Sequence, residues 1–216
     1  MKLFLDTANL EDIRAAARLG VIHGVTTNPS LISREKGDFR AIIREIASLV
    51  NGPVFAEVLS ADADGMVREG RELAAVDPAV CVKIPMTEEG LSAVSVLSKE
   101  GIRCCCTLVF SAAQALLAAN AGARYVAPFI GRYDDIGCDG IEAVASIAEV
   151  LGDGDFDTEV IAASVRSPLH AVEAARAGVD IATVPPKVLF QMAHHPLTDA
   201  GLARFMKDWA ESGREL

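Results

Sequence analysis

The feature that most constrains the fold is a unit of one short apolar strand and one amphipathic helix, which recurs eight times along the chain. The strands are rich in Val, Ile and Leu and are apolar almost throughout, as expected when both faces of a parallel sheet are covered. They lie near residues 2–6, 23–27, 53–58, 80–84, 104–109, 125–129, 159–164 and 180–184. The helices follow at 10–19, 39–50, 62–75, 88–99, 111–121, 140–151, 168–177 and 186–194.

Eight such units predict an α/β fold, a (β/α)8 TIM barrel. The interval from Asp6 to Thr183 averages about 25 residues per unit, which is the length that a strand, a three-turn helix and two short loops need. A doubly wound sheet is the alternative. It usually has fewer units and a glycine-rich first turn, and the sequence contains no G-x-G-x-x-G or Walker motif. We expect residues 1–216 to form a single barrel domain.

An extra C-terminal helix is predicted at residues 198–213, beyond the eighth unit. Leu202, Phe205, Met206 and Trp209 follow helical spacing and form one apolar face. This helix either folds back on its own barrel or docks on a neighbouring subunit, and the sequence leaves both possibilities open.

Charge and hydropathy exclude several classes of partner. A net charge of −10 argues against nucleic acid and against an anionic membrane surface. The uncharged stretch at 104–123 is long enough to suggest a membrane span, but Thr107, Ser111, Gln114 and Asn120 interrupt it. It is better interpreted as a strand followed by a helix. Because the apolar part of the N-terminus is too short for a signal peptide, we expect a cytoplasmic protein.

No metal site is predicted. The five cysteines include no C-x-x-C pair, and the consecutive Cys104, Cys105 and Cys106 alternate between strand faces, so they cannot share a metal ion. We interpret them as small buried side chains. His194 and His195 are adjacent, and on a helix they would point about 100° apart, so we do not interpret them as a pair of metal ligands.

Lys83 is the one charged residue in the apolar run V-C-V-K-I-P at residues 80–85. A lysine buried in such a strand must pair with a carboxylate or lose its proton, because desolvation can lower a lysine pKa by roughly 3–5 units. A neutral amine attacks carbonyl groups and forms Schiff bases. The alternative is a lysine at the end of its strand whose side chain reaches solvent.

The other candidate catalytic residues also stand where apolar strands stop, which is the active-site end of such a barrel. Lys83 is expected to attack a ketone and form an iminium. Glu57, with a water held by Thr107, is expected to serve the proton transfers of imine formation, and Asp6 to take the proton from the hydroxyl that becomes an aldehyde. A sugar-phosphate isomerase with Glu57 as base, and a barrel that only binds sugar phosphates, are the rival hypotheses.

A phosphate site is predicted from Arg132, just past the sixth strand, and from Ser164 and Arg166 after the seventh. Two guanidinium groups and a hydroxyl can hold a phosphate by charge-assisted hydrogen bonds and so position the rest of the substrate. In an acidic protein, one local cationic site is a better anchor for an anionic substrate than a diffuse basic face.

These residues bring out a resemblance to the small transaldolases and the related fructose-6-phosphate aldolases, which are class I aldolases built on a (β/α)8 barrel. The sequences T-T-N-P-S and V-K-I-P are the most specific of the matching motifs. The matching segments lie at 5–8, 24–30, 82–85, 107–111, 125–132, 162–166 and 183–185, over essentially the whole chain.

The resemblance implies a transaldolase of the pentose phosphate pathway that acts on sugar phosphates without a cofactor. It implies that Lys83 is the Schiff-base lysine and that Thr26 and Asn28 contact the dihydroxyacetone part of the substrate. It gives Asp6, Glu57, Thr107, Arg132, Ser164 and Arg166 the roles stated above. The C-terminal helix resembles the one by which this family forms homo-oligomers, pentamers or decamers.

Four positions bear on the choice between the two activities. The fructose-6-phosphate aldolases carry glutamine where this chain has Glu57 and tyrosine where it has Phe129. At both positions this chain resembles the transaldolases instead. Ala127 replaces a serine, and Cys105 an asparagine, that are common in transaldolases. Each change removes a polar contact to the ketose, worth about 0.5–1.5 kcal/mol. A fructose-6-phosphate aldolase that releases dihydroxyacetone is therefore the alternative.

Overall fold

The computed structural model describes residues 1–152 and 154–215. Eight parallel strands close into a barrel in chain order, each paired with the next and β8 with β1. The (β/α)8 prediction is confirmed, and the doubly wound alternative is wrong. The strands are β1 (Lys2–Asp6), β2 (Ile22–Thr26), β3 (Val54–Glu57), β4 (Val80–Pro85), β5 (Cys104–Val109), β6 (Tyr125–Pro128), β7 (Glu159–Ala162) and β8 (Ile181–Val184).

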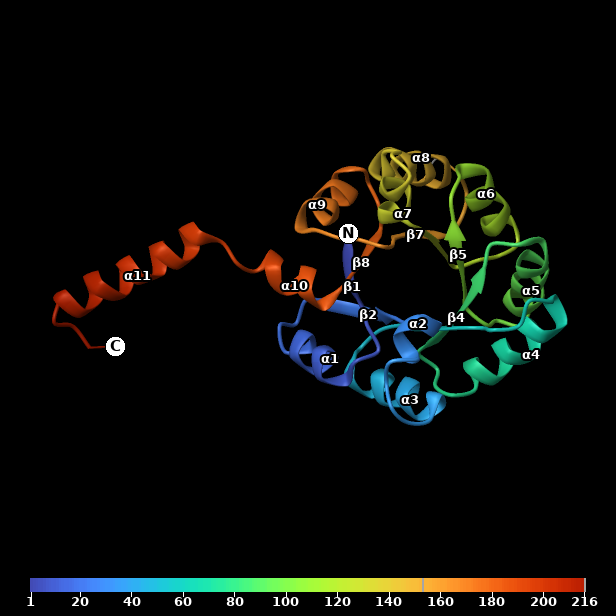
Figure 1. The fold of residues 1–216 in the computed structure, drawn as a ribbon, viewed down its shortest axis with the longest axis horizontal. Helices are drawn as coiled ribbons and strands as arrows, with labels where there is room; N and C mark the ends of the chain where they lie inside the picture. The colour runs from blue at the N-terminus through green and yellow to red at the C-terminus, as the bar shows by residue number, and fades with distance from the viewer. Residues whose placement is uncertain (153, 216) are drawn as a thin grey trace.

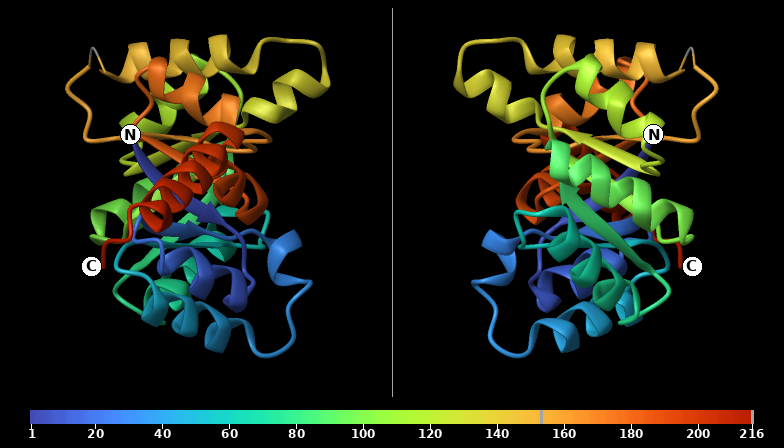
Figure 2. Two further views of the ribbon diagram at one scale, coloured as in Figure 1. Left: turned by 90° about the vertical axis from the view of Figure 1, so that its left-hand side faces the viewer. Right: turned by 90° about the vertical axis from the view of Figure 1, so that its right-hand side faces the viewer.

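Apart from α2 and α7, the helices α1 to α10 surround the barrel, and α11 projects away from it (Figure 1). Two short helices, α2 and α7, were not predicted; they protrude at the end of the barrel opposite the N-terminus (Figure 2). The helices are α1 (Leu10–Ala17), α2 (Pro29–Ile32), α3 (Phe39–Leu49), α4 (Ala63–Ala74), α5 (Glu88–Lys99), α6 (Ala112–Asn120), α7 (Ile130–Asp135), α8 (Gly140–Gly152), α9 (Pro168–Arg176), α10 (Pro186–Met192) and α11 (Pro196–Glu211).

Side-chain capping explains where several helices begin. The side chains of Thr87, Ser111 and Ser167 each accept a hydrogen bond from the backbone amide three residues further on, at 2.9 to 3.2 Å. This satisfies one of the amide groups that the first turn of a helix leaves without a partner. At helix ends, Gly101 and Gly178 have a φ of 78°, a left-handed conformation that costs glycine little.

The strands alternate between two cores, which explains why they are apolar on both faces. One set of side chains packs inside the barrel and includes Phe4, Phe55, Cys81, Cys105, Tyr125, Ile161 and Ile181. The other set packs outward against the helices and includes Leu5, Val54, Val82, Ile84 and Val126. Because successive side chains of a strand point to opposite faces, the strands other than β2 contribute to both cores. Cys104, Cys105 and Cys106 are buried, as the interpretation of small buried side chains requires, and Cys138 is exposed.

Residues 104–123 divide into β5 and α6, with Ser111 as the cap between them, and do not form one long helix. Within the described residues, no helix is long and apolar enough to cross a membrane.

The C-terminal helix α11 begins at Pro196, two residues before the predicted start, because His195 caps it by accepting a hydrogen bond from the amide of Leu197. The helix has no buried residue, and Phe205 and Met206 are each 64% exposed. The interpretation in which this helix folds back on its own barrel is therefore wrong. Docking on a second subunit stays a prediction.

Candidate active site

Strand register brings the predicted catalytic residues together. Glu57 on β3 is the register partner of Lys83 on β4, and Asp6 on β1 is the register partner of Thr26 on β2. Parallel strands in register point paired side chains to the same face. Five polar residues stand two positions after members of the inner core, and so point inward one level above it: Asp6 after Phe4, Glu57 after Phe55, Lys83 after Cys81, Thr107 after Cys105 and Thr183 after Ile181.

Lys83 is buried and paired. Its side chain is 8% exposed, and Nζ donates hydrogen bonds to Glu57 Oε2 at 3.0 Å and to the Thr27 carbonyl at 3.3 Å. Of the alternatives that the sequence left open, pairing with a carboxylate is the one found, and the solvent-reaching lysine is wrong. In such a pair a proton can pass from the ammonium to the carboxylate, which leaves a neutral amine beside its own acid.

Asp6 approaches Lys83 from β1 and belongs to a chain of hydroxyl groups. Thr26 Oγ1 donates to Asp6 Oδ1 at 2.8 Å and lies 2.6 Å from Thr183 Oγ1, which therefore donates to Thr26. Burial raises the pKa of Asp6 above its ordinary value, while the hydrogen bond from Thr26 and the charge of Lys83 act in the opposite direction. A carboxylate whose pKa is raised in this way accepts a proton more readily, as a general base must.

Thr107 is 1% exposed, and its hydroxyl has no hydrogen-bond partner among the described residues. An unsatisfied buried hydroxyl is costly, and such groups in native proteins usually have a functional explanation. Thr107 is paired in register with Pro85, two residues after Lys83. Its position suits a group that holds a water molecule or a substrate hydroxyl near the lysine.

A cavity of about 190 Å³ opens onto Asp6 and Lys83 at the carboxyl ends of the strands, whereas Glu57 and Thr107 are not among its lining residues. Asn28 reaches it from the start of α2; its side-chain oxygen accepts a hydrogen bond from the Leu31 amide at 2.9 Å, so its amide nitrogen is available for a ligand. Phe129 forms an apolar wall and packs against Phe110, with 6.0 Å between ring centroids. The cavity is lined by Asp6, Thr26, Asn28, Lys83, Ala127, Phe129, Arg132, Ile161, Ala163, Ser164 and Thr183.

Of the predicted phosphate site, Arg132 and Ser164 line the cavity, but Arg166 does not. Arg166 Nη1 and Nη2 donate to the two carboxylate oxygens of Asp135 at 2.5 and 2.6 Å. The Arg166 guanidinium holds the pKa of Asp135 below its ordinary value. The use of these three groups as a phosphate site stays a prediction, and the sequence analysis did not identify Asp135 as the partner of Arg166.

Sequence reasoning also missed α2, α7 and the Thr27 carbonyl that accepts from Lys83. The dipeptide Asn28-Pro29 was a usable signal for α2, because a capping asparagine followed by proline is typical of a helix start. No comparable signal precedes α7, whose first residue has no side-chain cap. The Thr27 interaction is made by backbone and leaves no mark in the sequence.

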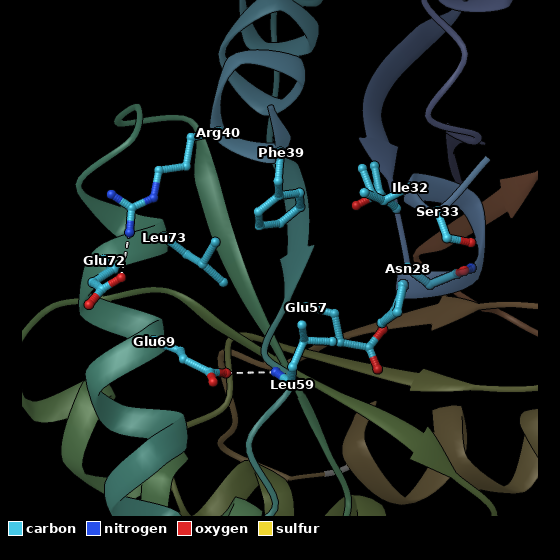
Figure 3. A pocket seen from close by; sticks show the side chains of 12 residues that line it. Asn28, Ile32, Ser33, Phe39, Arg40, Glu57, Leu59, Glu69, Glu72 and Leu73 are labelled. Carbon is cyan, nitrogen blue, oxygen red and sulfur yellow. Dashed lines mark hydrogen bonds and ion pairs between the residues drawn. The ribbon is translucent and has the colours of Figure 1, made fainter. Parts of the chain in front are cut away.

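A second cavity, of about 360 Å³, lies on the other side of Glu57 (Figure 3). Its walls are mainly apolar and include Ile32, Phe39, Leu59 and Leu73. The polar groups at its edge are already satisfied: Arg40 pairs with Glu72 at 2.5 Å, and Glu69 accepts from the Leu59 amide at 2.6 Å. Glu57 therefore stands between Lys83 and a hydrophobic space.

Comparison with known proteins points to one family. The family model described as "Transaldolase/Fructose-6-phosphate aldolase" matches residues 3–216. A protein named "Probable transaldolase" from Thermoanaerobacter sp. (strain X514) is 57% identical over 216 residues, which is all of both chains. A protein of the same name from Moorella thermoacetica is 60% identical over 209 residues, 97% of each chain.

Solved structures support the fold alone. Thiamine phosphate pyrophosphorylase from Pyrococcus furiosus superposes with a TM-score of 0.61 at 19% identity, over 89% of this chain and 93% of that one. Mandelate oxidase superposes with a TM-score of 0.60 at 13% identity, over 86% of this chain and 65% of the other.

Proposed function

The chain belongs to the transaldolase/fructose-6-phosphate aldolase family, and from that premise we propose that it is a transaldolase that works through a Schiff base on Lys83. It transfers a dihydroxyacetone unit from sedoheptulose 7-phosphate to glyceraldehyde 3-phosphate, which gives erythrose 4-phosphate and fructose 6-phosphate. The observation that carries this proposal is the buried pair of Lys83 and Glu57, 3.0 Å apart, of which Lys83 lines the cavity.

Imine formation begins when the Lys83 ammonium passes a proton to Glu57. The neutral amine then adds to the ketose carbonyl. Protonated Glu57 returns the proton to the carbinolamine hydroxyl, which leaves as water and produces the iminium. The free hydroxyl of Thr107 is placed to hold that water until it is needed for hydrolysis.

Carbon–carbon cleavage follows, and it uses Asp6 where imine formation used Glu57. Asp6 takes the proton from the hydroxyl next to the bond that breaks, and that carbon becomes the aldehyde. The electron pair of the bond passes into the iminium and gives an enamine. Thr26 and Thr183 hold the Asp6 carboxylate in place through their hydrogen-bonded chain. The acceptor aldehyde then adds by the reverse steps, while Arg132 and Ser164 hold its phosphate at the far end of the cavity.

Trapping tests the proposal directly. Incubation with fructose 6-phosphate and borohydride is expected to leave a reduced three-carbon adduct on Lys83, identified by mass spectrometry. Lys83→Met should give no adduct. Lys83→Arg keeps the charge and should lose activity, whereas an isomerase that uses Glu57 as base would retain it. Calorimetric binding of the sugar phosphate without any adduct would instead favour a barrel that only binds.

A fructose-6-phosphate aldolase is the second candidate, because Ala127 lines the cavity without a polar group for the ketose. The side chain of Phe129 favours transfer, since an apolar wall offers no proton to the enamine and leaves it waiting for an acceptor. Turnover of fructose 6-phosphate with and without erythrose 4-phosphate separates the two. A transaldolase needs the acceptor, and undiminished turnover without it supports the aldolase.

We also propose that the protein acts in the cytoplasm as a homo-oligomer, a pentamer or decamer, assembled through α11. The support is the apolar face of a helix that touches no buried part of its own barrel (Figure 1). Residues such as Leu202 and Phe205, 61% and 64% exposed, are unusual on a free surface when they occur together.

A further inference from the structure

Arg166 stands beside the phosphate end of the cavity but is held by another anion. Its two terminal nitrogens are both committed to Asp135, at 2.5 and 2.6 Å. The cavity itself is lined at that end by Arg132 and Ser164. Among the described residues no carboxylate forms an ion pair with Arg132, although its charge, after that of Arg166, helps to lower the pKa of Asp135. The site thus holds one guanidinium ready for an anion and a second that is already occupied.

Gly131 allows the occupied guanidinium to lie close to the cavity. A β-carbon at this position would be 2.5 Å from Arg166 Nε and 2.9 Å from Ser164 Oγ, so only glycine leaves room for both groups. The Arg166 head therefore lies over the first turn of α7, between Asp135 on one side and the Ser164 hydroxyl on the other. The guanidinium thus lies close to both possible partners, Asp135 and an anion bound beside Ser164.

The backbone that carries Arg166 is fixed, so such a change involves the side chain alone. The Arg166 amide donates to His170 Nδ1 at 3.4 Å, and His170 Nε2 lies 3.5 Å from Asp134 Oδ2. Ser164, two residues earlier, has a φ of 57°, a left-handed conformation that its surroundings must impose. The two paired side chains, in contrast, are 47% and 45% exposed.

We infer that Asp135 is a latch on the phosphate site: it holds Arg166 until a phosphate group enters, and the guanidinium then leaves Asp135 for the phosphate beside Ser164 and Arg132. This inference rests on the proposed function. A neutral hydroxyl cannot replace a bidentate carboxylate, whereas a phosphate offers more charge and three acceptor oxygens. The latch therefore opens for phosphorylated sugars and stays closed for unphosphorylated ones, and Asp135 becomes a specificity-determining residue.

Calorimetric titration with inorganic phosphate tests the latch on the full-length protein. Because an ion pair this exposed is weak, its removal should give a modest gain: Asp135→Asn is expected to bind phosphate about two- to fivefold more tightly than the wild type. Asp139→Asn is the matched control. It removes one charge four residues after Asp135, between α7 and α8, and asparagine can still cap α8 by accepting from the Ile141 and Glu142 amides. Its phosphate affinity should equal that of the wild type.

Arg166→Gln identifies the group through which Asp135 acts. This variant should bind phosphate more weakly, and adding Asp135→Asn to it should give a clearly smaller gain than in the wild type, because only the charge effect on Arg132 remains. Unchanged or weaker binding by Asp135→Asn would overturn the latch, as would the absence of phosphate binding by both the wild type and this variant. Because these titrations involve no imine, they are independent of the Lys83 adduct, whose absence would count against the proposed function instead.

A crystal structure of the wild-type protein with inorganic phosphate is the second measurement, and it needs no variant to fold. Arg166 is expected to donate to the phosphate, with its bond to Asp135 broken. A phosphate seated on Arg132 and Ser164 while Arg166 still holds Asp135 in both bonds would refute the latch.

Discussion

At the scale of single residues, the site is built from buried polar groups whose costs differ in kind. Lys83 and Glu57 satisfy each other. Asp6 is hydrogen-bonded but remains desolvated, and Thr107 has no partner among the described residues. Groups of this kind reduce stability, and native proteins keep them where activity requires them. Replacing Asp6 or Thr107 should therefore change stability and activity in different directions.

Thr107→Val is expected to leave stability unchanged or to raise it by up to about 1 kcal/mol, because valine has a similar shape and no hydroxyl to satisfy. The same change should slow adduct formation on Lys83 by about tenfold or more, since the water that serves imine formation loses its holder. Urea denaturation and timed borohydride trapping measure the two effects.

Thr158→Val is the control for this substitution. The Thr158 hydroxyl donates to the Ala123 carbonyl at 2.7 Å, and Thr158 lies just before β7, whereas Lys83 is on β4. Loss of this hydrogen bond should therefore cost about 1 kcal/mol of stability and leave trapping at Lys83 unchanged. A Thr107→Val variant that is less stable than the wild type and forms the adduct at the wild-type rate would contradict the role proposed for Thr107.

Asp6→Asn should make the protein more stable at pH 7. Since burial raises the pKa of Asp6 in the folded state, the folded protein binds this proton more tightly than the unfolded chain does. Stability is therefore lost as the pH rises through the raised pKa, and asparagine avoids that loss. The gain should shrink as the pH falls toward the ordinary value of 3.8, and it should vanish below that value, where both states are protonated.

Denaturation midpoints at pH 7 and pH 4, at one protein concentration, measure this difference. Asp62→Asn serves as the control, because Asp62 is an exposed cap of α4 whose role asparagine can fill. If Asp6→Asn is destabilised equally at both pH values, the hydrogen bond from Thr26 outweighs the burial of the charge.

At the scale of the elements, the connection after β4 fixes the end of the strand that carries Lys83. Gly90 lies in the first turn of α5, and a β-carbon there would be 2.0 Å from the Pro85 carbonyl oxygen. Gly90→Ala must push α5 away from β4, which we expect to cost about 1–3 kcal/mol and to reduce trapping at Lys83.

Gly152→Ala is the matched control for this prediction. Gly152 is also helical, and among the described residues no atom outside its own helix lies within 4 Å of its missing β-carbon, so alanine should be neutral or stabilise by up to about 1 kcal/mol. Thermal unfolding of both variants compares them. If both alanine variants unfold at the wild-type temperature, the fit between α5 and β4 is looser than the structure indicates.

The same elements explain which parts of the site the sequence could predict. The sequence placed Asp6, Glu57, Lys83 and Thr107 where apolar strands stop, which is the active-site end of the barrel, and strand alternation explains why they point into it. Strand order then brought them together. The partner of Arg166 could not be predicted in this way, since Asp135 stands on the short helix α7 and meets Arg166 through side-chain geometry. Periodicity fixes faces, but it does not fix contacts between loops.

At the scale of the whole molecule, charge and shape act against each other. The chain carries a net charge of −10, so copies of it repel one another. Yet α11 presents Leu202, Phe205 and Met206 on a helix that its own barrel leaves uncovered. Association through this face must therefore overcome repulsion by burying apolar surface, and added salt should strengthen it by screening the charges.

The single tryptophan makes that association observable, because Trp209 lies on α11 and is 41% exposed in the isolated chain. Assembly should cover the indole and shift its emission to shorter wavelength, and dilution should reverse the shift in step with the mass measured by light scattering.

Substituting Phe205→Glu and Met206→Lys together should give a monomer whose barrel unfolds as before, since α11 contributes no buried residue. Lys207→Ala, a change to a side chain that is 73% exposed, should leave the assembly intact. A wild-type protein that is monomeric at micromolar concentration, with emission independent of dilution and salt, would leave the apolar face of α11 without the role we give it.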